Sequence, residues 1–522
     1  MRDFHLPGRS TVHAATAMCA TSHPLAALTA LDALRAGGTA ADAAIAAGLV
    51  LGSCEPQMTG IGGDMFALVK PAGTEDVRAL NGSGRAPAGF DADALRAAGH
   101  AAMPLDEAAA VTVPGAVAGF AALHEAYGRL PWADLIAPAI RAARDGVPVA
   151  PRTAWDWAQA EGRLKGTARD LFLVDGAAPA PGTPFRAPRQ ADLLERIAAE
   201  GPAGFYEGEA AADMVRSLRA QGGAHTEADF AAARATWHDP IRGPYRDAEL
   251  VEHPPNGQGA TAILLANVLS RFDIAALDPF GAERAHLEAE ATKLAYDARD
   301  RLVADGADPA TFLSDATADA LAALVDPGRV IPDPRAATRN VHKDTVYLTV
   351  VDGDRMAVSL IYSIFHSFGA GLASERFGVL FQNRGAGFTL KRGHPNEAAP
   401  NKRPMHTIIP GMLARDGRIA MPFGVMGGQY QATGHARLVS NLVDFGMDPQ
   451  EAIDAPRCFA TDGQLQIERG YAPAVKRALA DLGHRVTDPP TAIGGAQAIV
   501  IEANGTLTGG SDPRKDGCAL GY

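Results

Sequence analysis

Residues 342–371 limit the fold of this chain more than any other segment. They read HKDTVYLTVVDGDRMAVSLIYSIFHSFGAG, two apolar and β-branched runs separated by Asp-Gly, and this pattern predicts an antiparallel β-hairpin. The first run begins at Thr345, directly after a polar stretch, so a hydroxyl group stands at the first position of a core strand. A threonine in this place suits a residue that becomes a new chain terminus.

Composition narrows the possible partners and the compartment. The chain has 522 residues, a net charge of -12 and a pI of about 5.7, with no cluster of Lys and Arg, so nucleic acid is not an expected partner. Its four cysteines lack C-x-x-C spacing, which favours a reducing compartment. No signal-peptide pattern opens the sequence, and its most apolar stretch, 40–56, is too short to span a bilayer. We expect a cytoplasmic protein with no membrane partner.

The remaining sequence predicts one α/β unit. Helical apolar spacing covers 24–36, and a second helix over 39–52, apolar nearly all round, begins with Thr39 and Asp42, which resemble a capping box. Short strands are predicted at 64–72 and 76–84 and two further helices within 259–302, while helical patterns dominate 90–245. Residues 326–344 form the longest stretch without periodicity, and strands with glycine turns follow. Helices are therefore expected mostly early and strands mostly late, without repeats or a domain linker.

A threonine hydroxyl is a weak nucleophile unless a base removes its proton. The α-amino group of an N-terminal threonine can be that base, since such groups titrate near 7.7–8.0. Creating it requires a cut between Asp344 and Thr345, which the hydroxyl itself performs by attacking the Asp344 carbonyl in an N-to-O shift followed by hydrolysis. Most strand threonines are only structural, so this interpretation depends on the rest of the chain.

Several motifs, in order, make the chain resemble the γ-glutamyltranspeptidase family of N-terminal-nucleophile hydrolases. They are EPQMTGIGGDMFALV (55–69), VTVPGAVAGF (111–120), GFYEGEAAADMV (204–215), HPPNGQG (253–259), NKRPMHTIIPGML (401–413), GVMGGQ (424–429), DAPR (454–457) and the final GCALGY. The resemblance implies a four-layer αββα sandwich. It also implies a large chain 1–344 and a small chain 345–522 that stay together as a heterodimer, with any higher oligomer left open.

The resemblance assigns the catalytic residues by position. Thr345 matches the nucleophile, and Ser363 matches a hydroxyl residue on the second strand of the hairpin that orients it. Gly427 and Gly428 match the glycine pair whose backbone N–H groups form the oxyanion hole, a role that suits residues without a side chain. The glycines of TGIGGD (59–64) are better explained by close backbone packing than by phosphate binding, and no spacing indicates a metal or cofactor site.

The substrate end departs from the family pattern. The arginine that holds the γ-glutamyl carboxylate is replaced by Ser83, and the paired acids that hold the α-amino group become Ala386 and Gly387. Arg384 takes the position of a glutamine or glutamate, Phe365 that of an asparagine on the second strand, and His406 and Thr407 those of two serines. The candidate substrate contacts are therefore Arg85, Arg384, Phe365, His366, His406 and Thr407. Each arginine is equally well explained as a structural residue, His366 is better explained as one, and His406 fits either role.

The expected activity follows from this pocket. The family implies a γ-glutamyltransferase or glutathione-hydrolase-like amidohydrolase that acts through an acyl-enzyme on Thr345. The lost acids and the gained guanidinium favour an alternative, an oxamate amidohydrolase or an acylase of dicarboxylic acyl groups that needs no α-amino group. A shortened segment after Phe388 favours hydrolysis over transfer. A catalytically silent homologue that binds an acidic metabolite is the distant alternative.

Overall fold

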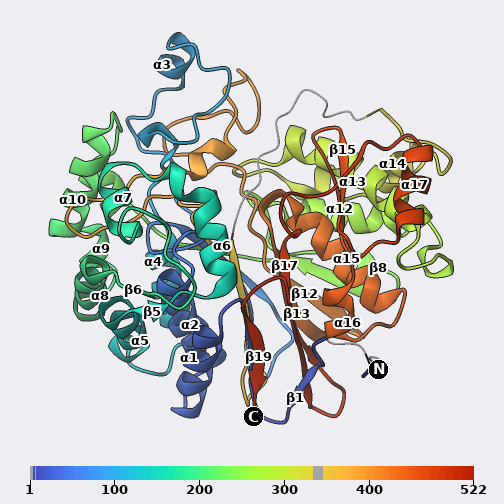
Figure 1. The fold of residues 1–522 in the computed structure, drawn as a ribbon, viewed down its shortest axis with the longest axis horizontal. Helices are drawn as coiled ribbons and strands as arrows, with labels where there is room; N and C mark the ends of the chain where they lie inside the picture. Colours follow the sequence, from blue (N-terminus) through green and yellow to red (C-terminus); the bar gives the residue numbers. More distant parts are fainter. Residues whose placement is uncertain (1–3, 6–7, 333–344) are drawn as a thin grey trace.

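Two seven-stranded antiparallel sheets pack face to face, and helices cover the outer face of each (Figure 1). The coordinates are a computed structural model, which describes residues 4–5, 8–332 and 345–522. The four-layer αββα sandwich implied by the sequence is confirmed. Within the described residues no helix is both long enough and apolar enough to cross a membrane.

The first sheet contains the predicted hairpin at its centre. Its order is β19 (Cys518–Gly521), β2 (Met18–Thr21), β10 (Val346–Val351), β11 (Ala357–Ser363), β3 (Asp64–Lys70), β4 (Arg78–Gly82) and β7 (Thr236–His238). Every residue of β10 and β11 is buried, because the second sheet covers one face and helices cover the other. These helices are α1 (Pro24–Arg35), α2 (Ala40–Cys54) and α4 (Ala116–Tyr127).

The second sheet lies against the first. Its order is β1 (Val12–Ala14), β18 (Leu507–Ser511), β17 (Gly495–Ile501), β13 (Arg418–Met426), β12 (Gly411–Arg415), β9 (Ala248–Glu252) and β8 (Ile241–Tyr245). Its outer face carries α12 (Gly259–Leu269), α15 (Gln431–Val443) and α16 (Pro449–Asp454), and α13 (Ala282–Leu302) packs beside α12. Phe66, Tyr347 and Met426 belong to a buried cluster between the sheets.

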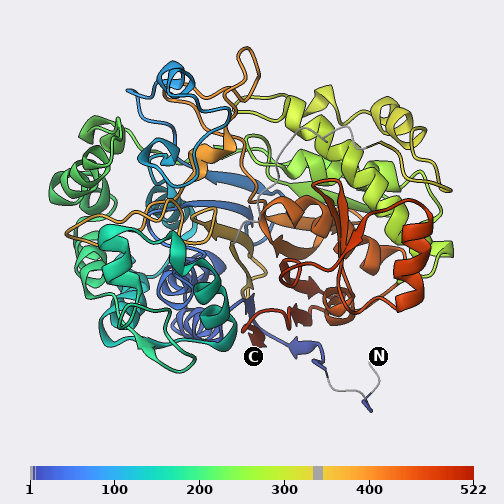
Figure 2. The ribbon, with the colours of Figure 1, turned by 45° about the horizontal axis from the view of Figure 1, so that its top comes forward.

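The other elements surround this sandwich, and Figure 2 shows the helices of the first half gathered on the side of the first sheet. They are α3 (Ala92–Ala97), α5 (Trp132–Asp145), α6 (Pro151–Ala160), α7 (Gly166–Phe172), α8 (Pro188–Glu200), α9 (Ala203–Tyr206), α10 (Gly208–Ala220), α11 (Glu227–Ala231), α14 (Asp315–Ala322), α17 (Pro473–Asp481), β5 (Val147–Pro148), β6 (Pro184–Phe185), β14 (Cys458–Thr461), β15 (Gln464–Ile467) and β16 (Val486–Thr487). The two helices predicted before residue 55 match α1 and α2. The capping box of Thr39 and Asp42 is present.

The hairpin forms, but its turn differs from the prediction. The connection spans residues 352–356 instead of the two residues Asp-Gly, and Arg355 rather than Gly353 has a positive φ of 62°. The Asp352 carboxylate sets this loop by accepting the N–H groups of Asp354 and Met356. The resulting register pairs Val346 with Tyr362. Thr345, directly before Val346, and Ser363, directly after Tyr362, therefore lie at the same end of the sheet.

Helices lie mostly early, as expected, since α1–α14 precede residue 323, but the strands are divided almost evenly before and after residue 345 instead of lying mostly late. Four strands precede residue 83, and both sheets combine strands from before and after residue 345. β10 pairs with β2, β11 with β3, and β12 with β9, so the two segments are interleaved in one folded unit. Strands as short as β1 and β2 carry too little alternation to be recognised in the sequence.

Because of this interleaving, we expect a chain cut before Thr345 to remain assembled. The two pieces should elute together in size-exclusion chromatography under native conditions and separate on a denaturing gel, since their strands share ladders in both sheets. Release of either piece without denaturant would contradict this topology.

Candidate active site

The candidate nucleophile and its hydroxyl partner lie in hydrogen-bond contact. Thr345 Oγ1 donates to Ser363 Oγ over 3.3 Å, and both residues are buried. Ser363 Oγ also accepts the Phe365 N–H at 2.9 Å and a guanidinium N–H of Arg384 at 3.2 Å. Three donors surround one hydroxyl oxygen, so its position is fixed relative to Thr345. Asp344, the other half of the predicted cleavage site, lies outside the described residues.

Arg384 is the most unusual residue of this group. Its guanidinium is fully buried, donates to Ser363 Oγ and to Thr407 Oγ1 at 3.1 Å, and lies 3.9 Å above the Phe365 ring. Its Nε atom has no hydrogen-bond partner among the described residues. Burial lowers the pKa of Arg384 to about 9, and the opposing effect comes from the more distant carboxylate of Asp64. The group therefore carries a positive charge at neutral pH with only neutral groups in contact.

Other buried arginines of the chain are neutralised differently. Arg284 and Arg437 share Glu288, Arg299 pairs with Asp300, and Arg457 pairs with Asp512. Arg403 lacks such a pair but donates to the backbone carbonyls of Ser83 and Arg234. Among the buried arginines that the structure describes, Arg384 alone has partners limited to hydroxyl groups and an aromatic ring. Since a buried charge is costly unless paired, this arrangement leaves room for an external anion.

Phe365 holds a strained backbone conformation beside Arg384. Its φ is 83°, in the left-handed region that a bulky side chain rarely adopts. This conformation turns its N–H towards Ser363 Oγ and its ring under the guanidinium. Strain of this kind costs roughly 1–3 kcal/mol and is concentrated at functional sites. The aromatic replacement noted in the sequence thus forms one wall of the arginine site.

Asp64 and His406 form a second buried pair beside the guanidinium. His406 Nε2 lies 3.1 Å from Asp64 Oδ2, while its Nδ1 accepts the N–H of Ile408 at 3.4 Å. These partners define the tautomer with hydrogen on Nε2. Burial, followed by the charge of Arg384, lowers the pKa of His406 to about 3, so its imidazole is neutral. Sequence reasoning missed Asp64 because it ends the glycine-rich TGIGGD, which was interpreted only as backbone packing.

The glycine pair stands at the end of β13, at the same end of the sandwich as Thr345. Gly427 and Gly428 have φ values of 120° and 56°, which exclude most other residues. A Cβ on Gly427 would lie 2.8 Å from Gly494 Cα, a distance too short for any side chain. Gln258, also missed from the sequence, donates to the carbonyls of both Gly428 and Thr407. It therefore links the glycine loop to the arginine site.

Two predicted substrate contacts lie elsewhere or are already engaged. Arg85 is half exposed, pairs with Asp305 at 3.0 Å and donates to the Asn401 carbonyl, so the structure does not bring it to Arg384. His366 lies beside Phe365 in the chain, and its Nδ1 is 2.8 Å from the Asn383 amide nitrogen. Thr407, by contrast, contacts Arg384 directly.

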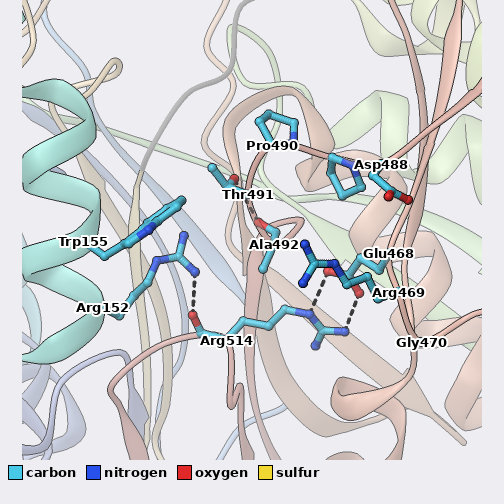
Figure 3. Close-up of a pocket in the computed structure, with 11 residues that line it drawn as sticks. Arg152, Trp155, Glu468, Arg469, Gly470, Asp488, Pro490, Thr491, Ala492 and Arg514 are labelled. Carbon is cyan, nitrogen blue, oxygen red and sulfur yellow. Dashed lines mark hydrogen bonds and ion pairs between the residues drawn. The ribbon is translucent and has the colours of Figure 1, made fainter.

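A cavity of about 510 Å³ lies apart from the residues named so far (Figure 3). It lies between α6, from which Trp155 faces it, and the loop 488–492 with Arg514 beneath. The same loop continues into Gly494, which packs on Gly427. The lining of the cavity thus ends two residues before the glycine that contacts Gly427.

One group of metal-ligand type occurs in the part of the chain that the structure describes. The ligand atoms of His286, Glu290 and His484 lie within 4.8 Å of one another. Lys293 Nζ is 2.7 Å from Glu290 Oε1, and the two imidazoles are hydrogen-bonded at 2.8 Å. Glu290 Oε2 also accepts the Ile331 N–H. Lys293 thus supplies the positive charge beside Glu290, and we interpret these three residues as a structural cluster.

The fold and the paired hydroxyls define the class as N-terminal-nucleophile hydrolases. The chain belongs to the γ-glutamyltranspeptidase family, because the Gamma-glutamyltranspeptidase family model matches residues 26–522. It is 35% identical to the glutathione hydrolase-like YwrD proenzyme of Bacillus subtilis and 36% identical to the oxamate amidohydrolase proenzyme of Klebsiella pneumoniae, in both cases over 97% of this chain and 98% of the relative. The crystal structure of a cephalosporin acylase from Bacillus halodurans has 37% identity and a TM-score of 0.93, with coverage of 100% of this chain and 99% of that one.

If Arg384 serves an external anion, it should not contribute to stability. We expect Arg384→Met to raise the free energy of unfolding by about 1 kcal/mol or more, because an apolar group of similar length replaces a buried charge. Arg457→Met is the matched control and should lose roughly 3–5 kcal/mol, since it strands Asp512. Thermal and denaturant unfolding of both variants would check this, and a large loss in Arg384→Met would contradict it.

Proposed function

We propose that this protein is an autoprocessed amidohydrolase that uses Thr345 to cleave a short amide bearing a carboxylate next to the scissile carbonyl, with oxamate as the model substrate. The single observation that carries the proposal is the buried Arg384 guanidinium, which lacks a carboxylate partner and lies one hydroxyl away from the candidate nucleophile. The similarity to the oxamate amidohydrolase proenzyme supports it.

The distances favour a short acyl group. Thr345 Oγ1 and Arg384 Nη2 are both bonded to Ser363 Oγ, at 3.3 Å and 3.2 Å, so their separation cannot exceed the sum of these lengths. Attack needs Oγ1 about 3–3.5 Å from the carbonyl carbon, and a charge-assisted bond needs about 2.7–2.9 Å from nitrogen to carboxylate oxygen. These two spans use most of the available length. A carboxylate bonded directly to the carbonyl carbon fits, whereas a glutaryl chain has to fold back.

A γ-glutamyl group is a poorer match. Its α-ammonium needs a free carboxylate, and the positions of the family's paired acids hold Ala386 and Gly387 at the end of the short helix Arg384–Gly387. The nearby Asp64 already accepts four hydrogen bonds, from the backbone of Gly84 and Gly115 and from the side chains of Gln382 and His406. No acid beside Arg384 in the described chain is thus available to an ammonium group.

The proposed reaction begins with the cut before Thr345. The new α-amino group accepts the proton of Oγ1, which attacks the amide carbonyl, and the N–H groups of Gly427 and Gly428 stabilise the oxyanion. The protonated amine then gives its proton to the leaving nitrogen, and water hydrolyses the ester on Thr345. With oxamate the products are ammonia and oxalate.

A substrate panel tests this proposal. We expect oxamate to be hydrolysed with a higher kcat/KM than a γ-glutamyl anilide or a glutarylated amine. Thr345→Ala should give one uncut chain without turnover. A preference for the γ-glutamyl compound by orders of magnitude would overturn the proposal.

The role of the guanidinium is tested separately. Arg384→Met should lower kcat/KM for oxamate through KM, by the roughly 1.5–3 kcal/mol typical of a hydrogen bond to a charged group, and should leave neutral oxamide within about threefold. Arg85→Ala is the matched control, because it removes a guanidinium that is paired with Asp305 outside this group. Equal effects of the two variants would contradict the assignment.

The similarity to the cephalosporin acylase favours a second candidate, an acylase that releases a bulky amine, and the cavity faced by Trp155 is the candidate place for that amine. Trp155 gives the cavity an aromatic face, and the loop 488–492 on its other side leads into Gly494, which packs on Gly427. If such an amine occupies the cavity, Trp155→Ala should lower kcat/KM at least tenfold for an oxalyl amide of an aromatic amine but leave oxamate unchanged. Leu324→Ala, which removes an exposed side chain elsewhere, is the control.

A further inference from the structure

Two opposite charges are buried side by side in the arginine site without touching. Asp64 and Arg384 are both completely inaccessible, yet no carboxylate oxygen of Asp64 lies within the 4.0 Å expected for an ion pair with the guanidinium. The charge of Asp64 nevertheless acts on Arg384 through space. His406, whose backbone neighbour Thr407 contacts Arg384, occupies the Asp64 Oδ2 atom.

The Asp64 carboxylate is held from several directions. It begins β3, directly opposite Ser363 in the ladder with β11. Oδ1 accepts from the backbone of Gly84 at 2.9 Å and Gly115 at 3.1 Å, and from Gln382 Nε2 at 2.9 Å. Its fourth donor is His406. Removal of His406 would therefore free one oxygen of an anchored carboxylate.

His406 is also fixed by its surroundings. Its N–H donates to the Asn256 carbonyl at 2.8 Å, its carbonyl accepts from Gln258, and its ring lies 4.7 Å from the ring of Phe66. Since Nε2 donates to Asp64 and Nδ1 accepts from Ile408, the imidazole is neutral and has no hydrogen to offer Arg384. A neutral, rigid group thus contacts the acid, while its chain neighbour Thr407 contacts the guanidinium.

We propose that His406 is a positioning residue, a neutral spacer that prevents Asp64 from pairing with Arg384 and so keeps the guanidinium available to the substrate carboxylate. Asp64 supports the buried positive charge at a distance without occupying its hydrogen-bonding edge. This inference rests on the proposed function, in which the substrate supplies the missing anion. It explains why the site contains an acid and an arginine that do not form the bidentate pair typical of these groups.

The spacer role predicts a specific pattern of rescue. In His406→Ala, Arg384 should move onto Asp64, and the KM for oxamate should rise at least tenfold with a smaller change in kcat. Neutral oxamide should be unaffected within about threefold. The double variant Asp64→Asn with His406→Ala should recover most of the oxamate affinity, because no carboxylate remains to capture the guanidinium. His406→Gln, which keeps a neutral donor of similar reach, should retain the wild-type KM.

His225→Ala is the matched control, since His225 is equally buried but bonds the Val111 carbonyl outside this group. An unchanged KM in His406→Ala, or a double variant as impaired as the single one, would overturn the inference. If His406→Ala does not fold, His406→Gln decides, because a raised KM in that variant contradicts a spacer. If the wild-type enzyme shows no preference for anionic over neutral amides, the proposed function itself is contradicted. If the wild-type enzyme prefers anionic amides and His406→Ala keeps that preference, only the spacer role of His406 is contradicted.

Discussion

The structure depends on burying both faces of the β10–β11 hairpin. A strand covered by a second sheet and by helices has no exposed residue, so the hydroxyl groups at its open end can be placed without access to bulk water. The register set by the Asp352 loop then brings Thr345 and Ser363 together, and β3 places Asp64 opposite Ser363. The positions of the nucleophile, its hydroxyl partner and the buried acid thus follow from two adjacent ladders, β10–β11 and β11–β3.

Exclusion of bulk water strengthens the electrostatic interactions of the charged groups in this site. In a low dielectric, an arginine without a partner attracts an anion strongly, whereas the same residue at the surface is screened. Arg85 illustrates the difference, since it is half exposed and already paired with Asp305. Arg384 is instead surrounded by two hydroxyl groups and the Phe365 ring, which orient it without neutralising it. Burial therefore distinguishes two arginines that the sequence left equivalent.

The sequence predicted the elements with strong periodicity and the residues that a family motif contains. The helices 24–36 and 39–52, the central hairpin and the four-layer architecture are confirmed. The predicted two-residue turn was wrong because the Asp352 side chain, and not Gly353, determines the conformation of the loop. The Asp64–His406 pair was not predictable, because it joins positions 342 residues apart that carry no common pattern, and the lack of a carboxylate beside Arg384 depends on the same folding. Long-range contacts decide them.

The replaced residues also act as a set rather than singly. An arginine in place of the family's glutamine or glutamate would be neutralised by any acid within reach, and this chain places Asp64 nearby. A neutral histidine at a family serine position satisfies that acid, and Phe365 fills the face of the guanidinium that would otherwise be bare. Each change therefore depends on the others, since the arginine alone would form an ion pair with an acid of the same chain instead of binding the substrate. A relative that shares only one of them is expected to keep a different acyl specificity.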